Sequence, residues 1–371
     1  MVSKDLVKAV AWYLPVIIWL VLGFVILSVV GCGDQKSDTE VTGPEDKVTE
    51  PEDDLPLDLP PDAESGWIDY NDPAWGKEYF LREDFTQNKF RITYSSETHN
   101  TMTMDGDQAT KPIKEESIEA VMTLTPTGTD QQGQKMLLLE TEQIVLETNN
   151  VRIDSLEPLT PEEFEQNRRL FDIHKALQTL AAEKITLLVD EKNVITDVTE
   201  SDLINKISEE SNTFKNFINS FGQTFKEKIV KSVFMAAADY LPQERIKIGS
   251  SWNILIPGDG GELGQIELWV QGLLDEIYTA EGREQARISF IVQQASADEK
   301  PTEINGQTVK ITQMSHNGTG SMVFDIAENF AAEYSIHLLG SIDIILPDEA
   351  KSKFSLDEEV RITKEIINDD K

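Results

Sequence analysis

The chain has 371 residues, with 67 Asp and Glu against 33 Lys and Arg, so its formal net charge at pH 7 is −34. A chain this acidic, without a basic cluster in its long C-terminal part, is poorly suited to bind nucleic acid or to dock on anionic lipid through charge. Hydrophobic residues make up 39% of it, enough for a sizeable core.

The N-terminus begins with a short positive stretch and continues as an apolar run. Lys4 and Lys8 lead into Ala9 to Gly31, which contains no charged residue. This order is typical of an export signal, but the run is also long enough to span a bilayer. Two interpretations stay open: residues 1–31 are a signal peptide that is cleaved, or they remain as a membrane anchor.

The only cysteine, Cys32, follows this run directly. The segment Val29-Val30-Gly31-Cys32 resembles the lipobox of bacterial lipoproteins, in which the chain is cut before a cysteine whose thiol carries the lipid. The resemblance implies that Cys32 is lipidated and that the protein lies outside the cytoplasm, attached to a membrane of a bacterial cell envelope. Gly33, where an aspartate would argue for inner-membrane retention, favours the outer membrane.

Residues 32–66 form the next segment, which is acidic and rich in proline. From Gly33 to Gly66 there are 12 acidic residues and two lysines, with little that could form a core. Such a composition buries too little apolar surface to offset the entropy cost of ordering. We expect a disordered tether that holds a folded body away from the membrane.

Residues 67–371 read as a single α+β domain. Apolar and polar residues alternate along most of it, which predicts strands with one buried face. Turn signals such as Glu281-Gly282 and Asn317-Gly318 predict hairpins between these strands. The expected fold is a large twisted antiparallel sheet, a meander that can curl into a half-barrel, with helices covering one face. The strands are expected around 90–94, 118–124, 137–146, 185–187, 194–195, 266–270, 288–292, 309–311, 322–326, 334–346 and 360–362.

A helical insert is expected over about 160–240. Thr160-Pro161 is an N-terminal capping signal, and the apolar residues behind it fall on one face of a helix. Further along, four phenylalanines recur at helical spacing: Phe214, Phe217, Phe221 and Phe225. Two readings of this stripe stay open, a packed core and a lid over an apolar ligand.

No motif in the sequence points to catalysis, to a metal or to a cofactor. The four histidines are scattered, with His316 beside the expected Asn317-Gly318 turn, and no paired-histidine spacing is present. The glycine-rich segment 258–264 is followed by strand-like alternation, so it reads as a hairpin loop and not as a phosphate-binding loop. We therefore predict neither catalytic residues nor metal ligands.

The segment Ile246 to Trp252 is similar to a stretch in an uncharacterised family of bacterial envelope lipoproteins, classed as a domain of unknown function. We expect Gly249 to form a turn and Trp252 to fill the core. The overall architecture also resembles the half-barrels of lipoprotein carriers, which implies an apolar ligand. The favoured function is a non-enzymatic module that binds an apolar ligand or an envelope protein. The alternative is a structural or assembly component with a solid core, and a carboxylate-based hydrolase ranks last.

Overall fold

The computed structural model describes residues 76–104, 110–148, 151–158, 168–190, 195–199, 240–259, 265–296, 301–304, 307–345 and 351–367, together with Phe214 and Val233. The predicted signal segment, Cys32 and the acidic tether lie outside the described residues, as does the capping signal at Thr160. The described elements are β1 (Phe90–Met104), β2 (Lys111–Thr129), β3 (Lys135–Thr148), β4 (Val151–Asp154), α3 (Arg168–Ala181), β5 (Lys184–Val189), β6 (Ile195–Thr199), β7 (Ser251–Asp259), β8 (Gln265–Ala280), β9 (Arg283–Ser296), β10 (Pro301–Ile304), β11 (Gln307–Asp325), β12 (Phe330–Ile345) and β13 (Lys351–Ile366).

All the described strands belong to one antiparallel sheet, as the sequence predicted. Its order is β6-β5-β3-β2-β1-β13-β12-β11-β9-β8-β7, with β4 beside β3 and β10 beside β11. Two meanders, β1 to β6 and β7 to β13, are therefore joined by the first and last strands. β1 and β13 pair over the whole of β1, from Phe90 opposite Ile366 to Met104 opposite Ser352.

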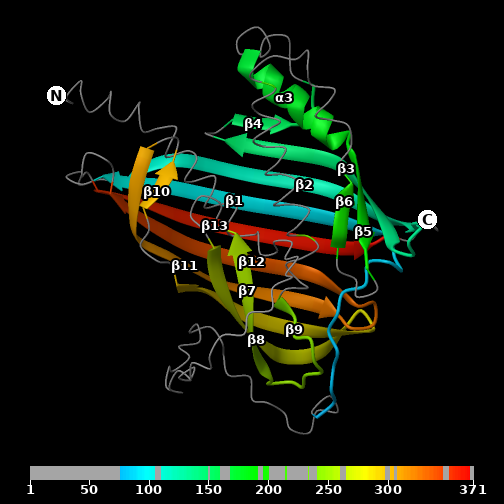
Figure 1. Cartoon of the computed structure of the whole chain (residues 1–371). Helices are drawn as coiled ribbons and strands as arrows, with labels where there is room; N and C mark the ends of the chain where they lie inside the picture. The colour runs from blue at the N-terminus through cyan, green and yellow to red at the C-terminus, as the bar shows by residue number, and fades with distance from the viewer. Residues whose placement is uncertain are drawn as a thin grey trace, which may run out of the picture.

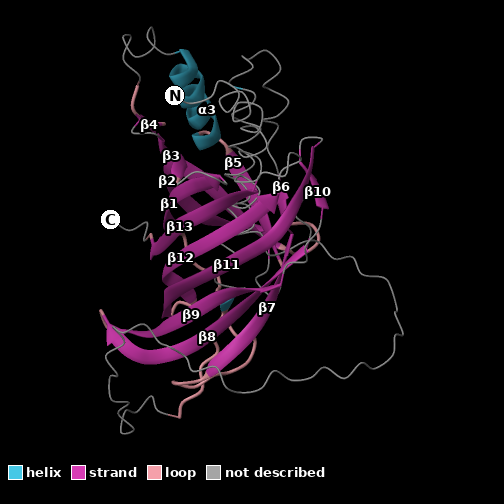
Figure 2. Ribbon diagram, turned by 90° about the vertical axis from the view of Figure 1, so that its left-hand side faces the viewer, coloured by secondary structure: helices cyan, strands magenta, loops and turns pink. Residues whose placement is uncertain are grey.

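The sheet is curved and open. Figures 1 and 2 show that the strands at the two ends of the order, β5 with β6 and β7, lie on the same side of the central strands. Side chains alternate along the strands, so that one face carries the hydrophobic core and the other is polar. We call these the buried face and the exposed face.

Two glycines allow aromatic rings to lie close against the buried face. A Cβ atom on Gly272 would come within 2.3 Å of the Trp252 ring, and one on Gly320 within 2.3 Å of the Phe290 ring. The Trp252 indole nitrogen donates a hydrogen bond of 2.9 Å to the Tyr240 carbonyl oxygen. Trp252 therefore fills the core, as the sequence predicted, and Gly249 forms a turn with φ of 79°.

Two predicted turns had different outcomes. Glu281 and Gly282 join β8 to β9 with positive φ values of 52° and 79°, which confirms that hairpin. Asn317 and Gly318 lie within β11 instead, so the prediction of a turn there is wrong. Gly318 is needed for a close approach: a Cβ atom would lie 2.5 Å from Leu338 Cδ2. The two strands expected around 309–311 and 322–326 are thus a single strand.

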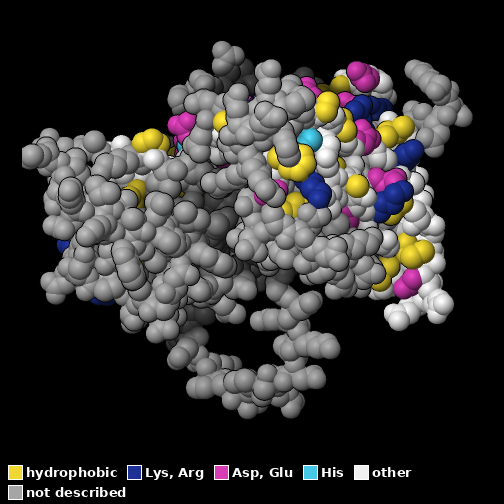
Figure 3. All heavy atoms as spheres, turned by 90° about the horizontal axis from the view of Figure 1, so that it is seen from above, with side chains coloured by type: hydrophobic (Ala, Val, Ile, Leu, Met, Phe, Trp, Pro, Cys, Tyr) yellow, Lys and Arg dark blue, Asp and Glu magenta, His cyan; other side chains and the backbone are white. Residues whose placement is uncertain are grey.

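The described residues contain one continuous helix, α3, and it packs on β3 and β4. Its buried positions, Ile173, Ala176, Leu177 and Leu180, form one stripe, which confirms the predicted apolar face. This stripe packs on β3 and β4, near one end of the strand order. The described residues therefore do not support the prediction that helices cover a face of the sheet. No helix in this described part is long and apolar enough to cross a membrane. Seen from above, the described surface carries acidic, basic and hydrophobic side chains in a mixture (Figure 3).

The segment before β1 is fixed to the sheet by a buried ion pair. Lys364 Nζ of β13 lies 2.6 Å from Glu83 Oε1, and the side chains are 2% and 3% exposed. The same carboxylate oxygen accepts a 3.0 Å hydrogen bond from the Ala331 amide at the start of β12. The Lys364 ammonium also lies 4.6 Å from the centroid of the Phe85 ring. This arrangement joins the chain before β1 to the two strands β12 and β13.

We predict that breaking this pair costs far more stability than removing both charges. Lys364→Met leaves a buried carboxylate without its cation, which should lower the free energy of unfolding by about 3–5 kcal/mol. Glu83→Gln with Lys364→Met removes both charges and keeps an acceptor for Ala331, so its loss should be about 1 kcal/mol. Urea denaturation measures both, with the exposed Lys353→Met as the control, expected within about 0.5 kcal/mol of wild type. A double variant as unstable as the single one would contradict this account.

Candidate functional site

The buried face is apolar over most of the central strands. Fully buried hydrophobic side chains on it include Phe90, Ile92, Met122, Ile362, Leu338 and Phe324. At roughly 25 cal/mol for each Å² of apolar surface, burying these side chains is the main source of stability. Polar side chains on such a face are costly, and those present therefore identify a candidate site.

Three consecutive inward positions of β1 are polar. Ser96, Thr98 and Asn100 continue the two-residue period of Phe90, Ile92 and Tyr94, and they are 2%, 6% and 2% exposed. At about 3.4 Å for each residue, they span roughly 14 Å along the strand. Apolar residues resume with Met102. We call Ser96, Thr98 and Asn100 the β1 polar track.

The Asn100 side chain is the member of the track with an unsatisfied hydrogen-bond donor. Its amide nitrogen Nδ2 is buried and has no hydrogen-bond partner in the described part of the chain. A buried donor without a partner costs about 1–3 kcal/mol. Groups of this kind need an explanation beyond packing, and a bound ligand is one.

Ionisable residues are paired with the track in the sheet. Glu358 of β13 and Glu116 of β2 are each directly opposite Thr98, and Lys114 of β2 is opposite Asn100. Glu358 is 0% exposed. His316 of β11 is opposite Gly340 and is 3% exposed. Burial lowers the pKa of His316 to about 4, against the opposing effect of Glu358, so its ring is neutral at pH 7. Burial also raises the pKa of Tyr94, with a further contribution from the charge of Glu358.

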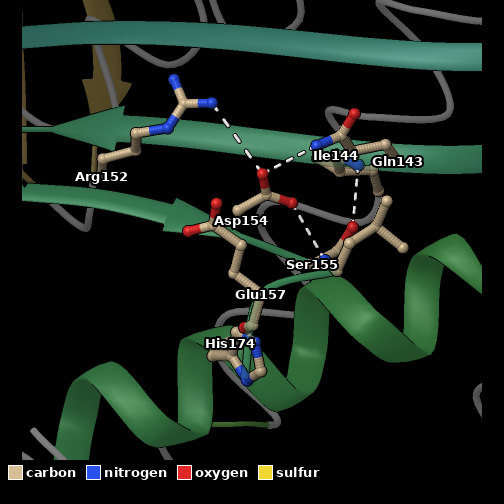
Figure 4. Close-up of polar contacts among 8 residues, drawn as sticks. Gln143, Ile144, Arg152, Asp154, Ser155, Glu157 and His174 are labelled. Carbon is tan, nitrogen blue, oxygen red and sulfur yellow. Dashed lines mark hydrogen bonds and ion pairs between the residues drawn. The ribbon is translucent and has the colours of Figure 1, made fainter. Parts of the chain in front are cut away.

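A second polar cluster, where β4 leads to α3, is structural (Figure 4). Asp154 accepts hydrogen bonds from Gln143 Nε2 at 2.7 Å and from the Leu156 amide at 2.9 Å. His174 Nε2 of α3 lies 2.7 Å from the Glu157 carbonyl oxygen, the only acceptor in that pair. These bonds hold α3 against β3 and β4, and they satisfy the hydrogen-bonding groups involved. In the described residues, no set of three His, Cys, Asp or Glu side chains could hold a metal ion.

Of the site residues selected from the sequence, the structure describes one, Phe214. Cys32, Phe217, Phe221 and Phe225 are outside the described residues. Phe214 is helical and 2% exposed, and the Lys175 ammonium of α3 is 5.6 Å from its ring centroid. Phe214 is therefore part of the hydrophobic core beside α3.

Sequence reasoning missed the β1 polar track, Glu358 and His316. His316 was expected beside a turn, because Asn317-Gly318 follows it. The track was missed because alternation was followed only as far as the apolar residues continued. The available signal was the phase set by Phe90, Ile92 and Tyr94, which also places Ser96, Thr98 and Asn100 on the inward side.

No family model and no curated protein matches this chain. Among solved structures, one of lipid–protein interactions in lipovitellin is 8% identical with a TM-score of 0.40, and the match covers 76% of this chain and 25% of that one. The chain thus matches only a quarter of that protein. Acinetobacter baumannii OccAB4 is also 8% identical, with a TM-score of 0.18 over 76% of this chain and all of that one. Scores this low give no support to a particular function.

We predict that His316 makes the protein less stable in acid. Its pKa is about 4 in the folded protein and about 6.5 in the unfolded chain, so the unfolded chain takes up the proton first. Its contribution is therefore complete above pH 6.5 and is lost as the pH falls from 6.5 to 4, by up to about 3 kcal/mol. His316→Gln cannot titrate and should flatten the dependence of unfolding free energy on pH over this range. The exposed His337→Gln is the control, and parallel curves for wild type and His316→Gln would contradict the prediction.

Proposed function

We propose that the protein is a non-enzymatic binding protein whose buried sheet face takes up an amphipathic ligand with an apolar chain. The observation that carries this proposal is the β1 polar track within an otherwise apolar face. A ligand with an acyl or similar chain would lie against the hydrophobic side chains, and its polar end would meet Ser96, Thr98 and Asn100. Ligand pockets share this design, with mostly apolar walls and a few polar groups that fix orientation.

The second candidate is a structural or assembly component with a solid core. It is favoured by the nearly complete burial of the face, since Phe90, Ile92 and Tyr94 are all 0% exposed. In that case the track contributes only to specifying how the strands pair. Because the face is already covered, a ligand has to replace contacts that now cover the track, and binding should be slow.

A stoichiometry measurement separates the two candidates. We predict that the full chain, exchanged from its membrane into amphipol, retains about one non-covalent lipid per protein, measured by solvent extraction and mass spectrometry. Ser96→Phe places a ring on the buried face and should displace this lipid. Ser95→Phe, on the exposed face of the same strand, should leave it bound.

Melting curves of both variants check that each still folds. If the wild type retains no lipid beyond the amount in Ser96→Phe, the binding function is excluded and the solid-core candidate stands.

We also propose that this body is displayed outside the cytoplasm on a lipid at Cys32, with the outer membrane favoured. The support is the position of Cys32 directly after the apolar run and before an acidic, proline-rich stretch. A tethered body of this kind could receive its ligand near the membrane or pass it to an envelope partner.

We predict that Cys32→Ser abolishes lipidation and leaves the N-terminal segment uncleaved, because the thiol is the group that takes the lipid. Metabolic labelling with a palmitate analogue should mark the wild type alone, and the variant should migrate as the larger precursor. Equal labelling of both proteins, or of neither, would favour the retained membrane anchor.

A further inference from the structure

We propose that the exposed face of β7, β8, β9, β11 and β12 carries a binding site for an uncharged polysaccharide, with Trp269 as its central contact. These five strands are consecutive in the sheet order (Figure 2). The site lies on the face opposite the β1 polar track, so the proposal does not rest on the function proposed above.

One row of outward side chains crosses all five strands. Its members are directly opposite one another in the register: Leu255, Trp269, Gln293, Asn317 and Leu339. All five are exposed, and Trp269 and Leu255 have 47% and 42% of their surface in solvent. Side chains directly opposite on one face have Cβ atoms about 4.5–5.5 Å apart, so Trp269 and Leu255 form one continuous apolar surface.

The neighbouring row of the same face adds further hydrogen-bonding groups. It consists of Asn253, Gln271, Ile291 and Thr319, which are again directly opposite one another on β7, β8, β9 and β11. Each of these side chains is exposed or half-buried. We call the two rows together the uncharged patch, because none of their nine residues is Asp, Glu, Lys or Arg.

A surface without charge is exceptional in a chain with 67 acidic and 33 basic residues. On β13, further along the same exposed face, most outward positions are charged: Lys351, Lys353, Asp357, Glu359, Arg361 and Glu365. Along β8 the nearest charged residues to Trp269 are Glu267 and Asp275, and both are acidic. The side chains of the uncharged patch are all described, so its lack of charge is a property of this part of the face.

The chemistry of the patch matches a chain of neutral sugars. Asparagine and glutamine amides, like the threonine hydroxyl, both donate and accept hydrogen bonds, as sugar hydroxyls do. An exposed indole offers a large, rigid apolar surface on which the C–H face of a sugar ring can stack. The first row places this apolar surface beside two amides, Gln293 and Asn317, over roughly 19 Å across the strands. A linear polysaccharide can follow the row with ring faces on Trp269 and hydroxyls on the amides.

Other occupants fit the patch less well. A polyanion is opposed by the net charge of −34, and a cationic partner finds no carboxylate within the two rows. A second copy of the chain would bring two strongly acidic bodies together. The two rows measure roughly 19 Å by 7 Å, whereas a stable protein interface needs roughly 800 Å² from each partner.

Electrophoresis of the full chain in amphipol, in native gels that contain a soluble polysaccharide, tests the proposal. The neutral probes are dextran, galactomannan and hydroxyethylcellulose, and the anionic probe is alginate. At least one neutral probe should retard the wild type, and alginate should not. Trp269→Ala should lower the association constant at least about tenfold, and Gln293→Ala about fivefold. Phe80→Ala removes a similarly exposed ring outside the patch, 43% in solvent, and should leave the association constant unchanged.

Each result supports the proposal or overturns it. Retardation by no neutral probe, or equal retardation of wild type and Trp269→Ala, would show that the patch does not bind polysaccharide. Retardation by alginate as strong as by a neutral probe would contradict the selection for uncharged sugars. If Trp269→Ala instead converts a dimer to a monomer in sedimentation, without any retardation of the wild type, the patch is an interface between copies.

Two further measurements complete the test. Should Trp269→Ala not give a normal melting curve, the retardation of Gln293→Ala decides in its place. Trp269→Ala should also retain the same amount of non-covalent lipid as the wild type, because Trp269 lies on the other face of the sheet from the β1 polar track. The two binding functions can therefore fail independently.

Discussion

The pairing of β1 with β13 is the constraint on which the rest of the structure depends. Each meander is built from neighbouring hairpins, but only this contact joins the two into one sheet. It places Glu358 opposite Thr98, and it brings Lys364 to the segment that holds Glu83. Most of the folded chain lies between β1 and β13 in the sequence, so their pairing closes a very long loop. The entropy cost of closing this loop comes before the contacts that offset it. We expect slow folding for this reason.

The polar residues on the buried face have a second physical consequence, which concerns register. Side chains alternate with a period of two, so a shift of β1 by one residue would turn Glu97 and His99 inward and expose Ile92 and Tyr94. The buried pair of Lys364 and Glu83 penalises such a shift further, since a slipped strand would leave one buried charge without its partner. The unpartnered amide of Asn100 does not follow from this argument, because a valine or threonine there would specify the register equally well. The ligand hypothesis accounts for that amide, and the solid-core hypothesis does not.

Local patterns in the sequence predicted the local structure well. Alternation gave most of the strands and their apolar inward residues, but not β4, β7 or β10, and the stripe on α3 followed from helical spacing. The strand order was not predictable, because the pairing of β1 with β13 leaves no local signal. Asn317-Gly318 shows the other limit: the same dipeptide that favours a tight turn also permits the close approach of Leu338 within a sheet. Only the neighbouring strand decides between these uses, and the pairing of Glu358 with the β1 polar track was missed for the same reason.

The edge strand β7 bears on the choice between an apolar ligand and a protein partner. The Ser250 carbonyl oxygen accepts a hydrogen bond from the Leu274 amide of β8. Backbone groups alternate in direction along a strand, so the N–H and C=O groups of Trp252, Ile254 and Ile256 also point toward β8. The backbone of Pro257 therefore faces away from β8, where its missing N–H removes a donor from the open side of the strand and none from the ladder. Proline at this position opposes the addition of a further strand. Pro257 thus disfavours strand addition at this point of the edge, and under the proposed function the ligand lies on the buried face with its β1 polar track.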